Sequence, residues 1–253
     1  MRFDLSGLAM TEEGLYAIAD KHHDPFIYEI VFDGSYWKIK NKLEISIGKK
    51  LDIEGIDACN QTFYIVDERS SSVFLYDGDW SEFKINSQEY AKEIKLNINN
   101  NGLEGIAVNC EKGKIYLAKE RQPRFILELE SGTGKVLQKF SIPETHSNDF
   151  ADLKYENGHL YILERNAYLI SKVSLETYKV VEKISFKSIC GEEGIKLYEP
   201  AKYGMAEAIL LLEDEIWIGL DNNSLNVSDF GRESYGISGN KPSILKFKRP
   251  DGF

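Results

Sequence analysis

The sequence predicts an all-β fold, a β-propeller of five four-stranded blades. One short motif recurs about every 50 residues, and a second run with an aromatic residue follows each copy. Both runs are rich in β-branched and aromatic residues and are bounded by turn-forming residues, which is typical of strands. Units of roughly 40 to 50 residues that hold four short strands are characteristic of propellers.

The first motif predicts the inner strand of each blade. In the second blade it is Ile53-Glu54-Gly55-Ile56-Asp57, and we call its second residue the anchor. The five anchors are Ser6, Glu54, Glu104, Ala151 and Glu207. The second run predicts second strands around residues 15–18, 63–66, 115–118, 160–163 and 216–219.

The remaining strands complete the blades of one domain, which we expect to span residues 1–253. Third and fourth strands are predicted at 26–32 and 37–47 in the first unit, and at 125–129 and 136–142 in the third. The last unit offers 206–212, 215–220 and 243–248, one strand short. We expect residues 1–5 to supply an N-terminal strand that completes this blade and closes the ring. A sixth, degenerate blade is the alternative, and residues 222–241 are predicted to form a loop at the channel mouth.

Composition narrows the function classes. The chain has 41 acidic residues against 31 Lys and Arg, a net charge of −10. This balance argues against a nucleic-acid or anionic-membrane binder. No apolar run reaches the roughly 20 residues that span a bilayer. The visible N-terminus lacks a signal peptide, so we expect a cytoplasmic protein, or a secreted or periplasmic one if a leader was removed. Cys59, Cys110 and Cys190 are predicted to be reduced thiols.

Acidic residues recur at two places that a propeller brings together at one rim. Inner strands begin at Glu54, Glu104 and Glu207, and Asp52 and Asp149 stand two residues before their anchors. Second strands end with an acid in all five blades. These residues are Asp20, Glu68, Glu120, Glu164 and Asp221. Because antiparallel strands place these positions side by side, we expect the acids to meet at one mouth of the channel.

Carboxylates gathered around a narrow axis require neutralisation. One candidate is Ca²⁺, a hard cation that takes six to eight oxygen ligands. The predicted metal ligands are Glu54, Glu104, Glu207, Asp52 and Asp149. The other candidates are Arg69, Arg121 and Arg165, each of which directly follows one of the acids that end the second strands, and we expect these second-strand acids to pair with the arginines. The predicted ligand-binding residues are Glu68, Arg69, Glu120, Arg121, Arg165 and Asp221.

A structural role for the Glu-Gly repeat is the competing interpretation. Glycine would let neighbouring strands approach, and glutamate would bond nearby amides. The sequence contains no Gly-x-Ser-x-Gly and no His-Glu-x-x-His, so it identifies no catalytic residue.

The repeated motifs resemble those of a known family. Asp52-Ile-Glu-Gly-Ile with Phe63-Tyr-Ile-Val-Asp-Glu-Arg69, and Gly102-Leu-Glu-Gly-Ile-Ala with Ile115-Tyr-Leu-Ala-Lys-Glu-Arg121, are similar to the SdiA-regulated propellers. Phytase-like esterase domains are more distantly similar. The resemblance implies a propeller that binds Ca²⁺ at its channel through Glu54, Glu104 and Glu207. Ser6 and Ala151 depart from the pattern at two anchors.

Three functions follow as hypotheses. The first is a calcium-binding propeller that recognises a small anionic molecule through the rim arginines. The second is a Ca²⁺-dependent hydrolase of phosphate esters, carboxylic esters or lactones, in which a carboxylate activates water. The third is a metal-free scaffold that binds a protein at its rim.

Overall fold

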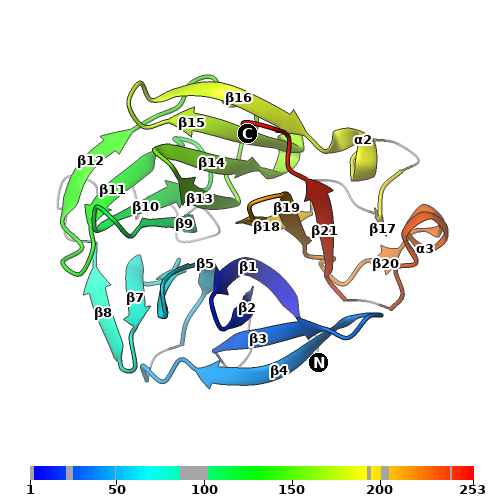
Figure 1. Ribbon diagram of the computed structural model, residues 1–253, viewed down its shortest axis with the longest axis horizontal. Coiled ribbons are helices and arrows are strands. Elements are labelled where there is room, and N and C mark those ends of the chain that lie inside the picture. The colour runs from blue at the N-terminus through cyan, green and yellow to red at the C-terminus, as the bar shows by residue number, and fades with distance from the viewer. Residues whose placement is uncertain are drawn as a thin grey trace.

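The chain folds into five antiparallel blades around a central channel (Figure 1). The computed structural model describes residues 3–20, 25–48, 50–85, 102–192, 195–200, 205–239 and 241–253. Four blades have four strands, and the fifth has three in this part of the chain, ordered β18-β19-β21. The prediction of a five-bladed all-β propeller is confirmed.

Each blade begins with an inner strand and continues outward. The inner strands are β1 (Asp4–Thr11), β5 (Ile53–Cys59), β9 (Leu103–Asn109), β13 (Asp152–Glu156) and β18 (Ala206–Leu211). The second strands are β2 (Gly14–Asp20), β6 (Thr62–Asp67), β10 (Lys114–Lys119), β14 (His159–Glu164) and β19 (Glu215–Leu220). The third strands are β3 (Phe26–Phe32), β7 (Ser72–Tyr76), β11 (Ile126–Glu130), β15 (Leu169–Ser174) and β21 (Ser243–Lys248). The fourth strands are β4 (Trp37–Glu44), β8 (Trp80–Lys84), β12 (Val136–Phe140) and β16 (Lys179–Ser185).

The ring closes where inner strand β1 packs beside β18. Asp4 and Leu5 pair with Asp20 and Ala19 inside the first blade, so they do not add the fourth strand that we expected in the fifth. The remaining part of that expected strand, residues 1–2, lies outside the described residues. Antiparallel pairing along the whole of β1 explains the difference, because it commits these residues to their own blade.

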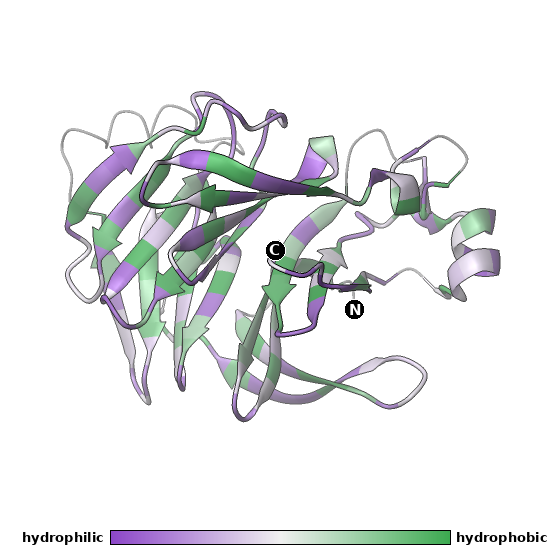
Figure 2. Cartoon of the chain, turned by 45° about the horizontal axis from the view of Figure 1, so that its top comes forward, coloured by the Kyte–Doolittle hydropathy of each residue, from purple (hydrophilic) through white to green (hydrophobic). Residues whose placement is uncertain are grey.

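Buried apolar side chains form five clusters, each between neighbouring blades. Between the first and fifth blades, for example, Leu8 and Tyr28 pack with Trp217. Figure 2 shows hydrophobic residues along strands throughout the ring. Every residue of β9 is buried, and because successive side chains point to opposite faces of a strand, both faces of a blade contribute. The core is therefore a ring of interfaces between blades.

A small lobe follows β19, where the sequence predicted a loop. It contains β20 (Asn226–Val227), paired with β17 (Tyr198–Glu199), and helix α3 (Asp229–Tyr235). The Ser228 Oγ accepts a hydrogen bond from Gly231 N at 2.9 Å and caps the helix, and Gly236 ends it in a left-handed conformation. Two further short helices are η1 (Arg165–Ala167) and α2 (Lys187–Cys190).

The prediction of three reduced thiols is wrong for two of them. Cys59 and Cys110 form a disulfide, with Cα atoms 5.7 Å apart. They lie at equivalent ends of neighbouring inner strands, and the packing of β5 against β9 brings them together. Cys190 is free and buried.

Candidate functional site

Anchor residues of four blades occupy irregular positions at the channel mouth. The strand register shifts across Ser6, Glu54 and Glu207 in their inner strands, and β9 shows a similar shift beside Glu104. A β-bulge inserts an extra residue and re-aims a side chain. All four anchors line one cavity of about 470 Å³. The bulges therefore explain how a strand residue comes to point into the mouth.

Glycine after the anchor has a separate role. A Cβ atom at Gly55 would lie 2.4 Å from the carbonyl oxygen of Glu104, and one at Gly105 would lie 2.8 Å from the Leu153 nitrogen. These distances are shorter than van der Waals contact, so the glycines permit close approach of neighbouring inner strands. This supports the structural interpretation for the glycine of the repeat.

The fourth blade supplies its acid differently. Its anchor is Ala151, β13 shows no register shift, and Asp149 enters the mouth from the preceding segment. Asp149 is held by an isolated bridge to Arg121 and by the side-chain amide of Asn166, at 2.6 Å from its Oδ2.

Second-strand acids reach the same cavity in four blades. Asp20, Glu68, Glu120 and Asp221 line it. The carboxylate of Glu164 instead accepts hydrogen bonds from Ser147 N at 2.7 Å and from the Ser171 hydroxyl. Glu164 therefore ties a loop to its own blade.

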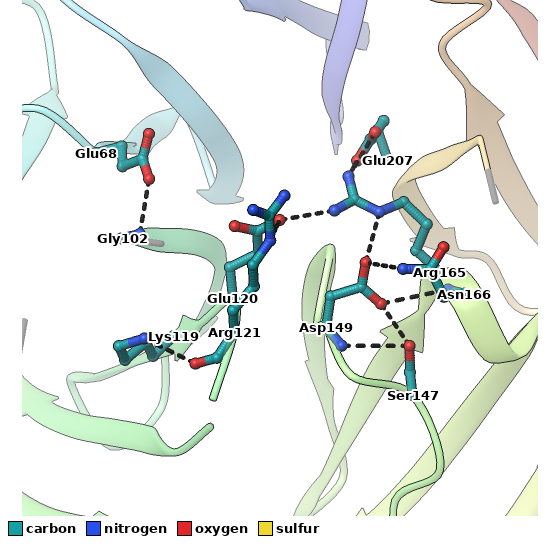
Figure 3. A network of polar contacts seen from close by, with 10 residues as sticks. All are labelled: Glu68, Gly102, Lys119, Glu120, Arg121, Ser147, Asp149, Arg165, Asn166 and Glu207. Carbon is teal, nitrogen blue, oxygen red and sulfur yellow. Dashed lines mark hydrogen bonds and ion pairs between the residues drawn. The ribbon is translucent and has the colours of Figure 1, made fainter. Parts of the chain in front are cut away.

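Arg165 is the centre of the polar network in Figure 3. Its Nη1 donates to both carboxylate oxygens of Glu207, at 2.7 and 2.6 Å. Its Nη2 donates to Glu120 Oε1 at 2.7 Å, and its Nε donates to Asp149 Oδ2 at 2.9 Å. The side chain is 11% exposed. One buried guanidinium thus joins carboxylates of the third and fifth blades and of the segment that precedes β13.

The expectation that second-strand acids pair with these arginines holds for Arg121 and Arg165, which both bond Glu120. Arg121 Nε donates to Glu120 Oε1 at 3.0 Å. Arg69 instead bonds Asp52, at 3.2 Å, and Arg165 bonds acids of other segments. Arg69 lies in the turn after β6 and Arg165 begins helix η1, so the chain changes direction there and these two side chains meet partners other than the acid before them.

Asp20, Asp52 and Glu54 form a second acidic group in the same cavity, distinct from the carboxylates that bond Arg165. One carboxylate oxygen from each lies within 4.8 Å of the others. Burial raises the pKa of Glu54 well above its ordinary value, and neighbouring carboxylates, Glu104 first, raise it further. A compact set of oxygen donors with mutual repulsion fits the needs of a hard cation.

Glu104 and Glu120 lie near Arg165. Burial raises the pKa of Glu104 well above its ordinary value, although the charge of Arg165 opposes the shift. Burial also raises the pKa of Glu120 against the effect of Arg165. Glu120 Oε2 is buried and accepts no hydrogen bond from the described residues.

The eleven residues predicted for the site all line this cavity. Within it, Asp52 and Glu54 gather with Asp20, whereas Asp149 and Glu207 bond Arg165. The cavity also includes residues absent from the predicted site, Asp4, Ser6, Asp20, Asn148, Asn166 and Asn223 among them. Asp20 could have been included, because it ends a second strand as the other acids do. The asparagines lie outside the repeated motifs, so no sequence pattern indicated that they line the cavity.

The profile of the SdiA-regulated family matches residues 1–206. The chain belongs to the SdiA-regulated family. No curated protein matches this SdiA-regulated propeller. Its fold is similar to that of glutaminyl cyclase from Myxococcus xanthus, with a TM-score of 0.61, 11% identity, and coverage of 86% of this chain and 85% of that one. A Bacteroides caccae protein of unknown function is also similar in fold, with a TM-score of 0.54 and 14% identity. The match covers 97% of this chain and 78% of that one. At these identities the likeness concerns the fold alone.

Among the described residues, no helix is both long enough and apolar enough to cross a bilayer.

Proposed function

We propose that the channel mouth binds Ca²⁺ through Asp20, Asp52 and Glu54 and presents it to a small anionic ligand. The observation that carries this proposal is the grouping of the three carboxylates, whose oxygens lie within 4.8 Å of one another. Ca²⁺ favours several carboxylate oxygens in flexible geometry, with water or backbone carbonyls completing the shell.

Arg165 explains why the cation is proposed for Asp20, Asp52 and Glu54 and not for the carboxylates that Arg165 bonds. Its guanidinium already bonds Glu120, Asp149 and Glu207, so it supplies the neutralising charge there. Glu54 is surrounded by carboxylates that raise its pKa, and a divalent cation would relieve that repulsion. The family resemblance implies Ca²⁺ at the channel through Glu54, Glu104 and Glu207, so it supports a cation at the mouth and shares Glu54 with this proposal.

Arg69 and Arg121 are the proposed contacts for the anion. Both line the cavity, and their side chains are 46% and 47% exposed. Each bonds its carboxylate through one nitrogen, Arg69 through Nη2 and Arg121 through Nε. A guanidinium has five N–H donors, so donors remain for a carboxylate or phosphate oxygen.

The alternative of a Ca²⁺-dependent hydrolase uses the same cation. Ser6 carries a hydroxyl in the cavity, but its Oγ donates to the carbonyl oxygens of Ile53 and Glu54, at 3.1 and 2.8 Å. A hydrolase would therefore have to use water, activated by the cation and a rim carboxylate. Because no described contact singles out such a water position, binding is the function that we propose.

Calorimetric titration of EDTA-treated protein tests the cation site. We expect saturable Ca²⁺ binding that Mg²⁺ does not reproduce, and Glu54→Gln should lower the affinity by about tenfold or more. Glu207→Gln is the matched control, since it changes an anchor at the same bulge position that bonds Arg165. Its Ca²⁺ affinity should stay within about twofold of wild type. Equal losses in both variants would reject Asp20, Asp52 and Glu54 as the ligand set, and no Ca²⁺ binding at all would favour the metal-free scaffold.

Inorganic phosphate and acetate test the anion site in the presence and absence of Ca²⁺. We expect tighter binding with Ca²⁺ and weaker binding in the Arg69→Met and Arg121→Met variants. Turnover of p-nitrophenyl phosphate or p-nitrophenyl acetate that requires Ca²⁺ and disappears in Glu54→Gln would establish the hydrolase instead.

A further inference from the structure

Glu104 differs from the other anchors at the channel mouth, because its carboxylate has no hydrogen-bonding partner among the described residues. The Ser6 hydroxyl donates to two backbone carbonyls, and Glu207 bonds Arg165. Glu54 lies in the group proposed for Ca²⁺. The Glu104 residue is only 9% exposed, and it lines the cavity of the mouth. A buried carboxylate without a partner is costly, so we expect a ligand to complete its surroundings.

The two positive charges already assigned to the mouth do not bond Glu104. In the described part of the chain, Glu104 is not among the carboxylates whose oxygens gather within 4.8 Å of one another. The hydrogen bonds of Arg165 go to Glu120, Asp149 and Glu207. Burial therefore raises the pKa of Glu104 well above its ordinary value, although the charge of Arg165 opposes the shift. A further positive charge would stabilise this carboxylate.

Glu120 adds acceptor capacity beside Glu104. Its negative charge, after burial, contributes to raising the pKa of Glu104, which places the two carboxylates near each other. Glu120 Oε1 accepts hydrogen bonds from Arg121 and Arg165, at 3.0 and 2.7 Å (Figure 3). Its Oε2 is buried and accepts none from the described residues. Carboxylates with unused acceptor capacity thus adjoin Arg121, one of the arginines proposed to bind the anion.

The charge of the cavity lining favours a ligand that brings positive charge. Ten acidic residues and three arginines of the described chain line the cavity. Ca²⁺ would neutralise two of the negative charges, so acids would still outnumber the positive charges. A ligand with only negative charge adds to this excess. A zwitterion adds no net charge and can place a cation beside the buried carboxylates.

We propose that the ligand of the mouth is a small zwitterion whose ammonium group binds Glu104. The inference rests on the proposed function, since the carboxylate or phosphate of the ligand would contact Ca²⁺ and Arg121. An ammonium group has three N–H donors and a full positive charge, which suit buried carboxylates. Arg121 bonds Glu120, and Glu120 adjoins Glu104, so the two ligand groups would lie close together. Amino acids and aminoalkyl phosphates have this arrangement, and a cavity of about 470 Å³ accommodates them.

Matched pairs of small molecules test the proposal by calorimetric titration of the Ca²⁺-loaded full chain. Glycine is compared with acetate, and 2-aminoethyl phosphate with ethyl phosphate, so that each pair differs in an ammonium group. We expect the ammonium member to bind at least about tenfold more tightly in each pair. This comparison requires no variant. Glu104→Gln should abolish the preference without weakening the binding of ethyl phosphate.

Glu207→Gln is the matched control, since it removes the same charge from an equivalent bulge where Arg165 already bonds the carboxylate. It should keep the preference for the ammonium member, and a loss of preference equal to that of Glu104→Gln would overturn the proposal.

Two further outcomes separate this inference from the proposed function. Equal binding of both members of each pair, with Ca²⁺ and ethyl phosphate bound normally, would overturn the zwitterion and leave the proposed function intact. If no member of either pair binds, both proposals fail. The Ca²⁺ affinity of Glu104→Gln should fall less than that of Glu54→Gln. An equal fall would make Glu104 a ligand of the cation and would also overturn the inference.

Discussion

Glu54 and Glu207 stand at the same bulge in two blades, yet their surroundings differ. Glu207 bonds Arg165 through both carboxylate oxygens, whereas Glu54 lies with Asp20 and Asp52. The repeat therefore determines where a carboxylate points, and a residue outside the motif determines what neutralises it. Arg165 comes from the fourth blade, whose own anchor is an alanine. One mouth can thus contain an internally compensated half and a half suited to an external cation.

The largest effect should come from removing the compensating charge. Arg165→Met would leave the buried carboxylates of Glu120 and Asp149 without their shared partner, and we expect a loss of about 3–5 kcal/mol in the free energy of unfolding. Arg69→Met removes an exposed pair with Asp52 and should cost at most about 1 kcal/mol. Urea unfolding without Ca²⁺ measures both. Similar losses in the two variants would show that the halves do not differ in compensation.

The next largest loss of stability should come from backbone packing at Gly55 and Ala208, the residues that follow the anchors Glu54 and Glu207. Gly55→Ala would place a methyl group against the Glu104 carbonyl, and we expect destabilisation of about 2–3 kcal/mol. The fifth blade already carries Ala208 at this position. Ala208→Gly should cost about 1 kcal/mol. Thermal unfolding of both variants tests this order, and a mild Gly55→Ala would remove the packing explanation for the glycine.

The fourth blade provides a pH-dependent comparison, since Asp152 stands where the first three blades have glycine. Burial raises the pKa of Asp152 to about 7, against the charge of Lys154, 3.6 Å from its carboxylate. The folded state then holds a proton that the unfolded state has lost. As the pH rises from about 4 to about 7, the free energy of unfolding should therefore fall. This group contributes a decrease of at most about 1.4 kcal/mol per pH unit.

Asp152→Asn isolates this contribution, because an amide oxygen can still accept the Ile209 N–H, at 2.9 Å in the native chain. Its stability measured by urea unfolding across this pH range should decline less steeply than that of wild type. Parallel curves would mean that Asp152 ionises normally.

The sequence predicted the features that repeat. Strand order and the blade count followed from a motif with regular spacing, and the gathering of Glu54, Glu104 and Glu207 at one mouth followed from the same spacing. The partner of Arg69 did not follow, because it depends on how neighbouring segments meet in space. Helix α3 could have been predicted from Ser228 before Asp229 and from Gly236 after the helix. The Cys59–Cys110 disulfide required the closeness of two inner strands, which no local pattern reveals.

Anomalous diffraction from crystals grown with Ca²⁺, and repeated with Sr²⁺ in its place, tests the central claim most directly. The account predicts one strong peak coordinated by carboxylate oxygens of Asp20, Asp52 and Glu54, with Arg165 still bonded to Glu207. A peak among Glu104, Glu120 and Glu207 with Arg165 displaced would contradict it, and so would a mouth without any peak at saturating cation.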